Sequence, residues 1–208
     1  MKLKNSNSCL LIIDVQLDFC PGGALAVAQG DHVVKPINKV TESFSNVILT
    51  QDWHPKAHSS FSSSHHGSLP FSEIQMPYGV QTLWPDHCIQ NSRGAEFHPE
   101  LNTASAQTII RKGFRHEIDS YSAFFENDGE TATGLQGWLV SKQIKNVYLV
   151  GLATDYCVAY SALDAARLGF NATVILSACR AIDLDYSLDR QLKKMHQAGI
   201  TLLENFPE

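Results

Sequence analysis

The sequence has no long apolar run, no block of basic residues and no closely spaced pair of cysteines. Its first apolar stretch spans only residues 9–13, which is too short to cross a bilayer or to form the core of a secretory signal. The net charge is −5 and the lysines and arginines are scattered, which argues against a protein held to nucleic acid by phosphate contacts. We therefore expect a cytoplasmic protein whose partners include neither a membrane nor a nucleic acid.

The five cysteines are odd in number and never form a CxxC pair. A chain of 208 residues with 44% hydrophobic residues can bury a core without disulfide staples, so we expect free thiols and no cysteine-based zinc module. The length suits one α/β domain over residues 1–208. It leaves open whether the chain forms a homo-oligomer.

Short, continuous apolar runs recur along the chain, as in strands buried on both faces of a parallel sheet. Stretches of helical periodicity separate them. One such stretch, around residues 33–44, has Pro36 near its start, where it could shift or kink the helix. Another follows Thr154 and Asp155, which we expect to cap it, and ends at Gly169. The expected strands are Leu10–Asp14, Val47–Thr50, Thr108–Arg111, Val147–Val150, Thr173–Leu176 and Ile200–Leu203.

This alternation predicts an open, mostly parallel sheet of about six strands with helices on both faces. The segment from residue 55 to about residue 103 shows no clear regular element. A long irregular segment in a compact domain is usually functional or disordered.

Four residues of complementary chemistry follow the expected strands. Asp14, Asp52 and Lys112 end the first three, and Cys157 lies in the turn after the fourth, where ligands bind in such sheets. A helix N-terminus and a nearby Lys112 ammonium would favour a thiolate at Cys157, and Asp14 could move its proton. Taken singly, these residues are a buried cysteine, a helix cap and a solvated strand end. Their combination predicts a cysteine nucleophile, with the other four cysteines structural.

Asp52 and His54 project on the same side of an extended chain. Together with His87 from the long loop, they could form a carboxylate–imidazole site for zinc, iron or manganese. No HExxH-type signature is present, so solvated loop histidines are an equal alternative on spacing alone. Further candidates in the same loop are His58, His65 and His66.

Around these residues the sequence resembles the nicotinamidase branch of the isochorismatase-like cysteine hydrolases, from about residue 9 to Arg180. The Asp, Lys and Cys indicate the superfamily, whereas the Asp-x-His and Trp-Pro-x-His-Cys elements indicate the branch. The segments that carry the resemblance are Asp14-Val-Gln-Leu-Asp-Phe-Cys-Pro-Gly-Gly23, Asp52-Trp-His54-Pro, Leu83-Trp-Pro-Asp-His87-Cys, Arg111-Lys112-Gly and Gly151-Leu-Ala-Thr-Asp-Tyr-Cys157-Val.

The resemblance implies an isochorismatase-like fold and hydrolysis of nicotinamide to nicotinate and ammonia, in NAD salvage, with pyrazinamide as a further substrate. It assigns Cys157 as nucleophile, Asp14 as proton shuttle and Lys112 as their electrostatic partner. Backbone N–H groups of Ala153 and Cys157 would form the oxyanion hole, built around a cis Leu152–Ala153 bond.

The same resemblance implies one divalent metal on Asp52, His54 and His87, with zinc ahead of iron or manganese. It leaves His58 open as a fourth ligand. For the substrate ring it implies a sandwich and a pocket wall, formed by Phe19, Trp84 and Tyr121.

Two other functions fit the sequence. One is a different cysteine amidase of the superfamily that acts on a carbamoyl or linear amide. The other is a non-enzymatic binding protein on the same fold.

Overall fold

The computed structural model of the chain describes residues 7–207. At its centre is a six-stranded sheet in the order β5–β2–β1–β6–β7–β8, in which every neighbouring pair is parallel. This confirms the predicted sheet and all six expected strands, including the short last one. The strands are β1 (Ser8–Ile13), β2 (Asn46–Asp52), β5 (Thr108–Lys112), β6 (Asn146–Leu152), β7 (Asn171–Arg180) and β8 (Thr201–Leu203).

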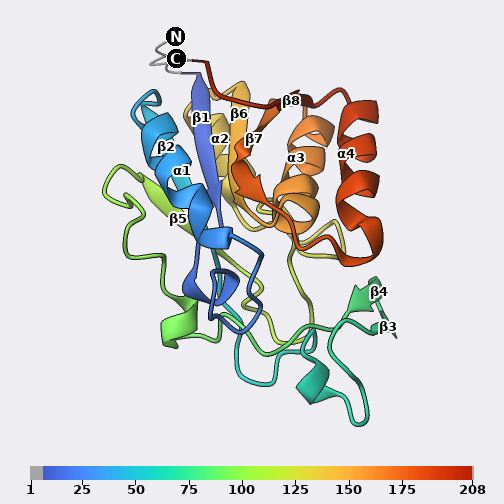
Figure 1. Cartoon of the computed structure of the whole chain (residues 1–208). Coiled ribbons are helices and arrows are strands. Elements are labelled where there is room, and N and C mark those ends of the chain that lie inside the picture. The colour runs from blue at the N-terminus through green and yellow to red at the C-terminus, as the bar shows by residue number, and fades with distance from the viewer. Residues whose placement is uncertain (1–6, 208) are drawn as a thin grey trace.

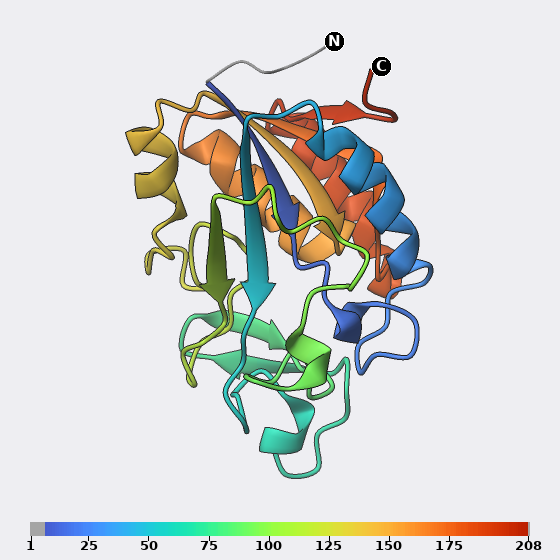
Figure 2. The same cartoon turned by 90° about the vertical axis from the view of Figure 1, so that its left-hand side faces the viewer.

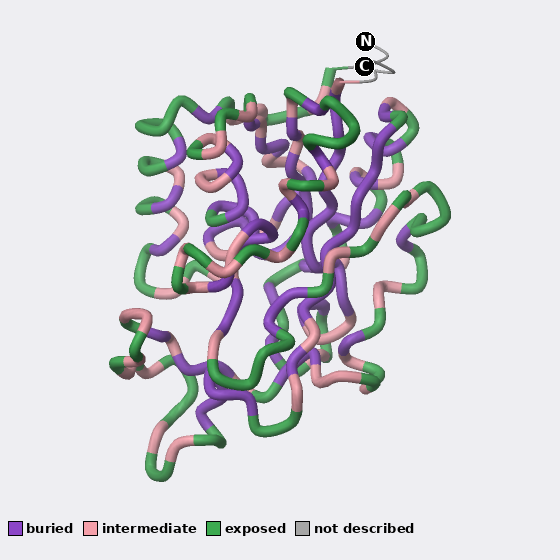
Figure 3. Tube along the Cα trace, turned by 180° about the vertical axis from the view of Figure 1, so that it is seen from behind, coloured by how far each residue is buried: buried purple, intermediate pink, exposed green. Residues whose placement is uncertain are grey.

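Helices cover both faces of the sheet, as predicted (Figure 1). One face packs against α1 and the other against α2, α3 and α4. Successive residues of β1 serve the two faces in turn, with Leu10 in the α1 core and Leu11 in the other, which is why the strand reads as continuously apolar. Figure 3 shows the strands buried along most of their length and the outer helix turns exposed. The helices are α1 (Val34–Thr41), α2 (Leu135–Ser141), α3 (Ala159–Arg167) and α4 (Ser187–Gln197).

Pro36 lies in the first turn of α1, where backbone N–H groups lack helical partners in any case. A 3₁₀ turn, Gly30–Val33, leads into the helix. The proline therefore sits where a helix tolerates it, near the start of the chain's first α-helix.

The predicted cap on α3 is wrong. A π-helical turn, Thr154–Val158, precedes α3, and no side chain caps that turn. The Asp155 carboxylate instead accepts hydrogen bonds from the backbone of Ile182 and Asp183, at 3.0 and 2.8 Å, and from the hydroxyl of Ser187. Asp155 therefore joins the turn before α3 to the start of α4.

The long segment after β2 contains a two-stranded antiparallel hairpin that the sequence did not predict, β3 (Glu73–Met76) with β4 (Gly79–Thr82). Its first strand is only partly buried, so it lacks a strong apolar pattern. Figure 2 shows β2 and β5 running towards this hairpin, which lies beyond the carboxyl ends of the sheet. Across residues 7–207, no helix combines the length and apolar character needed to cross a bilayer.

Candidate active site

The structure brings Asp14, Lys112 and Cys157 together at the carboxyl ends of β1, β5 and β6. The Lys112 ammonium lies 2.8 Å from the Asp14 carboxylate and 3.3 Å from the Cys157 sulfur. All three side chains are buried. Parallel strands end at one edge of the sheet, which is why residues nearly 150 positions apart meet here.

Lys112 has two further partners that the sequence did not predict. Its ammonium donates to the Asp52 carboxylate at 2.8 Å and to the Ser120 carbonyl at 2.9 Å. The carboxylates of Asp14 and Asp52 outweigh the effect of burial and hold the Lys112 pKa well above its usual range. The lysine therefore stays charged, and its ammonium contacts both the Cys157 sulfur and the Asp52 carboxylate.

Burial raises the pKa of the Cys157 thiol well above its usual range, and the Lys112 ammonium only partly opposes this. The Lys112 ammonium favours the thiolate, as expected, whereas burial acts against it. Burial also raises the pKa of Asp14, against the opposing effect of Lys112. The two groups are hydrogen-bonded neighbours, so one proton can pass between them.

Thr50 on the neighbouring strand fixes the Asp14 carboxylate. The Thr50 hydroxyl donates to Asp14 Oδ1 at 2.6 Å and accepts from the Asp14 backbone N–H at 3.1 Å. Asp14 has a positive φ of 47°, because the chain leaves the sheet at this residue. The other carboxylate oxygen is left facing Lys112.

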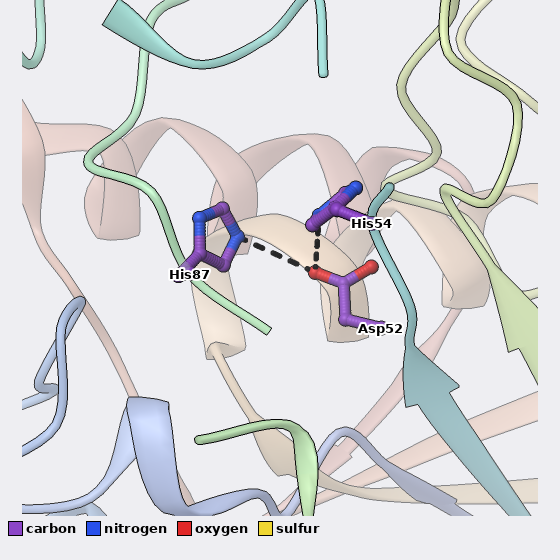
Figure 4. Close-up of side chains that lie close together, drawn as sticks. All are labelled: Asp52, His54 and His87. Atoms are coloured by element: carbon purple, nitrogen blue, oxygen red, sulfur yellow. Dashed lines mark ion pairs between the residues drawn. The ribbon is translucent and has the colours of Figure 1, made fainter. Parts of the chain in front are cut away.

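Asp52, His54 and His87 converge beside this group (Figure 4). Asp52 Oδ2 lies 3.2 Å from His54 Nε2 and 3.5 Å from His87 Nε2. Each Nδ1 faces a carbonyl, Gly113 for His54 at 2.9 Å and Pro85 for His87 at 2.8 Å, so Nδ1 carries the ring proton. Each Nε2 then presents a lone pair to a carboxylate, and His54 Nε2 has no hydrogen-bond partner. This buried set of donors fits a divalent cation.

Gly113, directly after Lys112, leaves room for the His54 ring. A Cβ at this position would lie 2.5 Å from the ring carbon Cε1, and the backbone has a φ of +63°. Both conditions require glycine. This accounts for the glycine in the Arg-Lys-Gly segment.

His58 has no free ring nitrogen. Its Nδ1 lies 2.7 Å from the Ser60 hydroxyl and its Nε2 lies 2.8 Å from the Arg115 carbonyl. It belongs to a second group of candidate ligands with His54 and Asp119, but its own nitrogens are engaged. The structure therefore disfavours His58 as a metal ligand and places its ring against that of His54, 4.5 Å between centroids.

The next two histidines of this loop lie outside both groups of candidate ligands. His65 is half-buried and its Nε2 lies 2.7 Å from the Ser59 carbonyl, whereas His66 is exposed.

One pocket adjoins the two groups. The three predicted substrate contacts, Phe19, Trp84 and Tyr121, all line it together with Cys157. The Trp84 indole N–H donates to the Tyr121 hydroxyl at 3.1 Å, and the Phe19 ring meets the edge of His87 at 5.5 Å. The sequence missed four further wall residues: Leu25, Asp119, Tyr156 and Ile182.

Two of these missed residues lie close in sequence to predicted site residues. Tyr156 directly precedes Cys157 and packs edge-to-face on Trp84, with 4.9 Å between ring centroids. Asp119 lies two positions before Tyr121. For Tyr156 and Asp119, the short distance in sequence to a predicted site residue could have indicated a place in the pocket. Leu25 and Ile182 are apolar residues of connecting loops and carry no such signal.

The peptide bond between Leu152 and Ala153 is cis, as the resemblance implied. Ala153 lines the same pocket as Cys157.

The sequence matches the isochorismatase domain family over residues 8–205. It is 50% identical to a nicotinamidase of Acinetobacter baylyi, over 96% of this chain and 94% of that protein. It is 42% identical to a nicotinamidase of Escherichia coli, over 93% of this chain and 92% of that protein.

Three solved structures share the fold. The nicotinamidase/pyrazinamidase of Acinetobacter baumanii superposes with a TM-score of 0.95 at 52% identity, covering 96% of this chain and 97% of that one. PnC1 from L. infantum, in complex with nicotinate, superposes with a TM-score of 0.83 at 37% identity, covering 96% of this chain and 93% of that one. A pyrazinamidase of Pyrococcus horikoshii, in complex with zinc, superposes with a TM-score of 0.78 at 33% identity, covering 96% of this chain and 99% of that one.

Proposed function

The chain belongs to the isochorismatase family, and on that premise we propose that it hydrolyses nicotinamide to nicotinate and ammonia, and pyrazinamide to pyrazinoate. The observation that carries the proposal is the buried Lys112 ammonium, which touches Cys157, Asp14 and Asp52 at one side of a single aromatic pocket. Two curated relatives at 50% and 42% identity are nicotinamidases, which supports the choice of substrate.

In the acylation step, Asp14 takes the proton of the Cys157 thiol. Lys112, 3.3 Å from the sulfur, stabilises the thiolate as it forms. The sulfur attacks the amide carbon, and backbone N–H groups of Ala153 and Cys157 bind the oxygen that becomes negative. Asp14 then returns the proton to the departing nitrogen, and ammonia leaves behind a thioester on Cys157.

Hydrolysis of the thioester uses the same groups in the opposite direction. Asp14, again a carboxylate, takes a proton from a water molecule that attacks the thioester carbon. The thioester bond breaks and the proton on Asp14 returns to the Cys157 sulfur. The carboxylic acid that leaves loses its remaining proton to solvent and becomes nicotinate. No net charge or redox change remains on the protein.

Asp52, His54 and His87 would hold one divalent cation, and we propose zinc, with iron and manganese as alternatives. When bound, this ion supplies a Lewis-acidic anchor for the ring nitrogen of the substrate. The zinc complex of the pyrazinamidase at 33% identity supports this choice. Gly113 and Pro85 fix the orientation of the two imidazoles through their carbonyls.

The pocket wall selects a flat aromatic amide. Phe19 and Trp84 would enclose the ring, and Tyr121 would form the third wall, with its hydroxyl held by the Trp84 indole. The nicotinate complex of the relative at 37% identity supports a pyridine carboxylate as product.

We also assign residues 1–208 to one hydrolase domain and the activity to the cytoplasm. One continuous sheet and the family match over residues 8–205 support the single domain. All five cysteines are free thiols in the structure, which supports a reducing compartment.

The test is an ammonia-release assay with nicotinamide, with elemental analysis of the same sample. We expect turnover, about one bound divalent ion per chain, and loss of turnover after chelation that zinc restores. A linear or carbamoyl amide serves as the comparison substrate. Turnover of the comparison substrate alone, insensitive to chelation, would replace the proposal with the other cysteine amidase.

A further inference from the structure

Gln16 lies in the turn after β1, is fully buried and takes no part in the proposed chemistry. Its amide nitrogen donates to the Asp52 carbonyl at 2.8 Å and to the Ala95 carbonyl at 3.0 Å. Its amide oxygen accepts from the Asp52 backbone N–H at 2.8 Å. One side-chain amide therefore binds both backbone groups of the metal-ligand candidate Asp52.

The reason lies in the way β1 ends. β1 pairs with β2 only as far as Ile12 and Leu49, because the chain turns away at Asp14. The backbone of Asp52 then has no strand beside it on that side. The Gln16 amide, which has the donor and acceptor of a peptide group, occupies this position and satisfies both buried groups.

Asp18, two residues later, holds the backbone beside the other candidate loop ligand. Its carboxylate accepts from the Cys88 N–H at 2.7 Å and from the Ala24 N–H at 3.2 Å. Cys88 directly follows His87 and has a positive φ of 45°. A Cβ on Gly94 would lie 2.0 Å from this carboxylate, so the loop packs directly against it.

We propose that Gln16 and Asp18 are positioning residues that set the metal affinity of the site, by fixing the backbones that carry Asp52 and His87. This inference rests on the proposed metal site. Neither side chain contacts the donor atoms themselves, so both act through the ligands. Groups that orient metal ligands in this way typically change metal affinity by 10- to 100-fold when removed.

The first test compares Gln16→Glu with Gln51→Glu. Gln51 is a matched control because its amide donates to the same Ala95 carbonyl, at 2.9 Å, from the residue before Asp52. Its amide oxygen accepts from Arg111 Nε at 3.1 Å, and its side chain does not bind the Asp52 backbone. The Gln16→Glu change keeps the side-chain shape but turns the amide nitrogen into an oxygen facing two carbonyl oxygens.

The measurement is the dissociation constant for Zn²⁺ alone, by competition with a chromophoric chelator, on metal-free protein shown to be folded by circular dichroism. Gln16→Glu should weaken Zn²⁺ binding by about tenfold or more, and Gln51→Glu by less than about threefold. Gln16→Met, which is neutral, is the second variant if the buried glutamate prevents folding. Asp18→Asn should shift the constant in the same direction as Gln16→Glu.

Equal weakening by the Gln16 and Gln51 variants would overturn the inference, and so would wild-type affinity in a folded Gln16 variant. A lower melting temperature of the metal-free protein with unchanged affinity would show a merely structural role and also overturn it. A wild type that binds no Zn²⁺ would do the same. Because the readout needs no substrate, wild type that binds Zn²⁺ yet leaves nicotinamide intact would refute the proposed function and leave the inference standing.

Discussion

Asp14 is the residue whose chemistry is simplest to remove without changing shape. Asp14→Asn keeps a group of the same size near Thr50 and Lys112 but cannot take the thiol proton. Turnover should fall by about 10³-fold, because the general base is lost. Nicotinamide binding should persist, as measured by tryptophan fluorescence, since Trp84 lines the pocket. More than about a tenth of wild-type turnover would contradict the shuttle role.

The matched control is Thr50→Val, which keeps the carboxylate and removes the hydroxyl 2.6 Å from it. Losing one neutral hydrogen bond to the catalytic group should lower turnover by only about five- to tenfold. The contrast between the two variants separates proton transfer from orientation.

Glu126 gives a pH dependence of stability outside the catalytic group. Burial raises its pKa to about 7, against the pull of the Arg115 guanidinium, and its second oxygen has no partner. A carboxyl with a raised folded pKa stabilises the fold below its ordinary value of 4.5 and loses that contribution as pH rises through about 7.

Glu126→Gln cannot ionise and should escape this loss. Relative to wild type, its free energy of unfolding should rise by about 2 kcal/mol between pH 4.5 and 8, as measured by urea denaturation at both values. A constant difference between the two proteins across this range would contradict the assignment. The nearby charges of Asp119 and Lys112 are unchanged by the substitution.

At the residue level the sequence predicted which polar side chains meet, because charged residues at the ends of buried strands converge on one edge. It could not predict that Lys112 also binds Asp52, since that contact depends on the register of β2 with β5. It could not predict the opposing effect of burial on the pKa of the Cys157 thiol, because burial is a property of the folded site.

At the scale of elements, Asp155 joins the turn that carries Cys157 to the beginning of α4. Asp155→Ala leaves two part-buried backbone N–H groups, of Ile182 and Asp183, and the buried Ser187 hydroxyl without this acceptor. The free energy of unfolding should fall by about 3 kcal/mol, measured by chemical denaturation.

Asp164→Ala is the control, because Asp164 makes an ion pair with Arg167 on the surface of α3, at 2.9 Å. This variant should change the free energy of unfolding by about 0.5 kcal/mol or less. Equal effects of the two substitutions would show that Asp155 does not connect the elements as described.

The strands and the helices were predicted well because each buries an apolar face with a regular period. The cap on α3 was wrong because Asp155 has alternative acceptor roles that only the tertiary arrangement decides. The β3–β4 hairpin was missed because its strands bury too little to leave an apolar alternation.

At the scale of the whole molecule, a metal bound to Asp52, His54 and His87 joins segments from β2 and the long loop. Zn²⁺ at about 100 times its dissociation constant should stabilise the native state by about 2.7 kcal/mol, raising Tm by roughly 5 to 10 °C. Thermal denaturation of metal-free protein with and without Zn²⁺ measures this shift. His54→Ala should show little of it, and an equal shift in that variant would remove His54 from the ligand set.

The fold class follows from the local apolar patterns, whereas the order of the strands became known only from the structure. The pocket cannot be predicted in this way, because its walls come from six separate segments of the chain. Only the resemblance, and not spacing, joined Phe19, Trp84 and Tyr121 to Cys157 before the structure was known.

The most direct test of the account is the chemical state of Cys157 during turnover. Each protein is mixed with excess nicotinamide, quenched in acid and analysed by mass spectrometry. The wild type and the control Cys179→Ala should both carry a nicotinoyl group on Cys157. Cys157→Ala should carry none. Ammonia release by Cys157→Ala at the wild-type rate, or turnover with no acyl group on this cysteine and an adduct elsewhere, would contradict it.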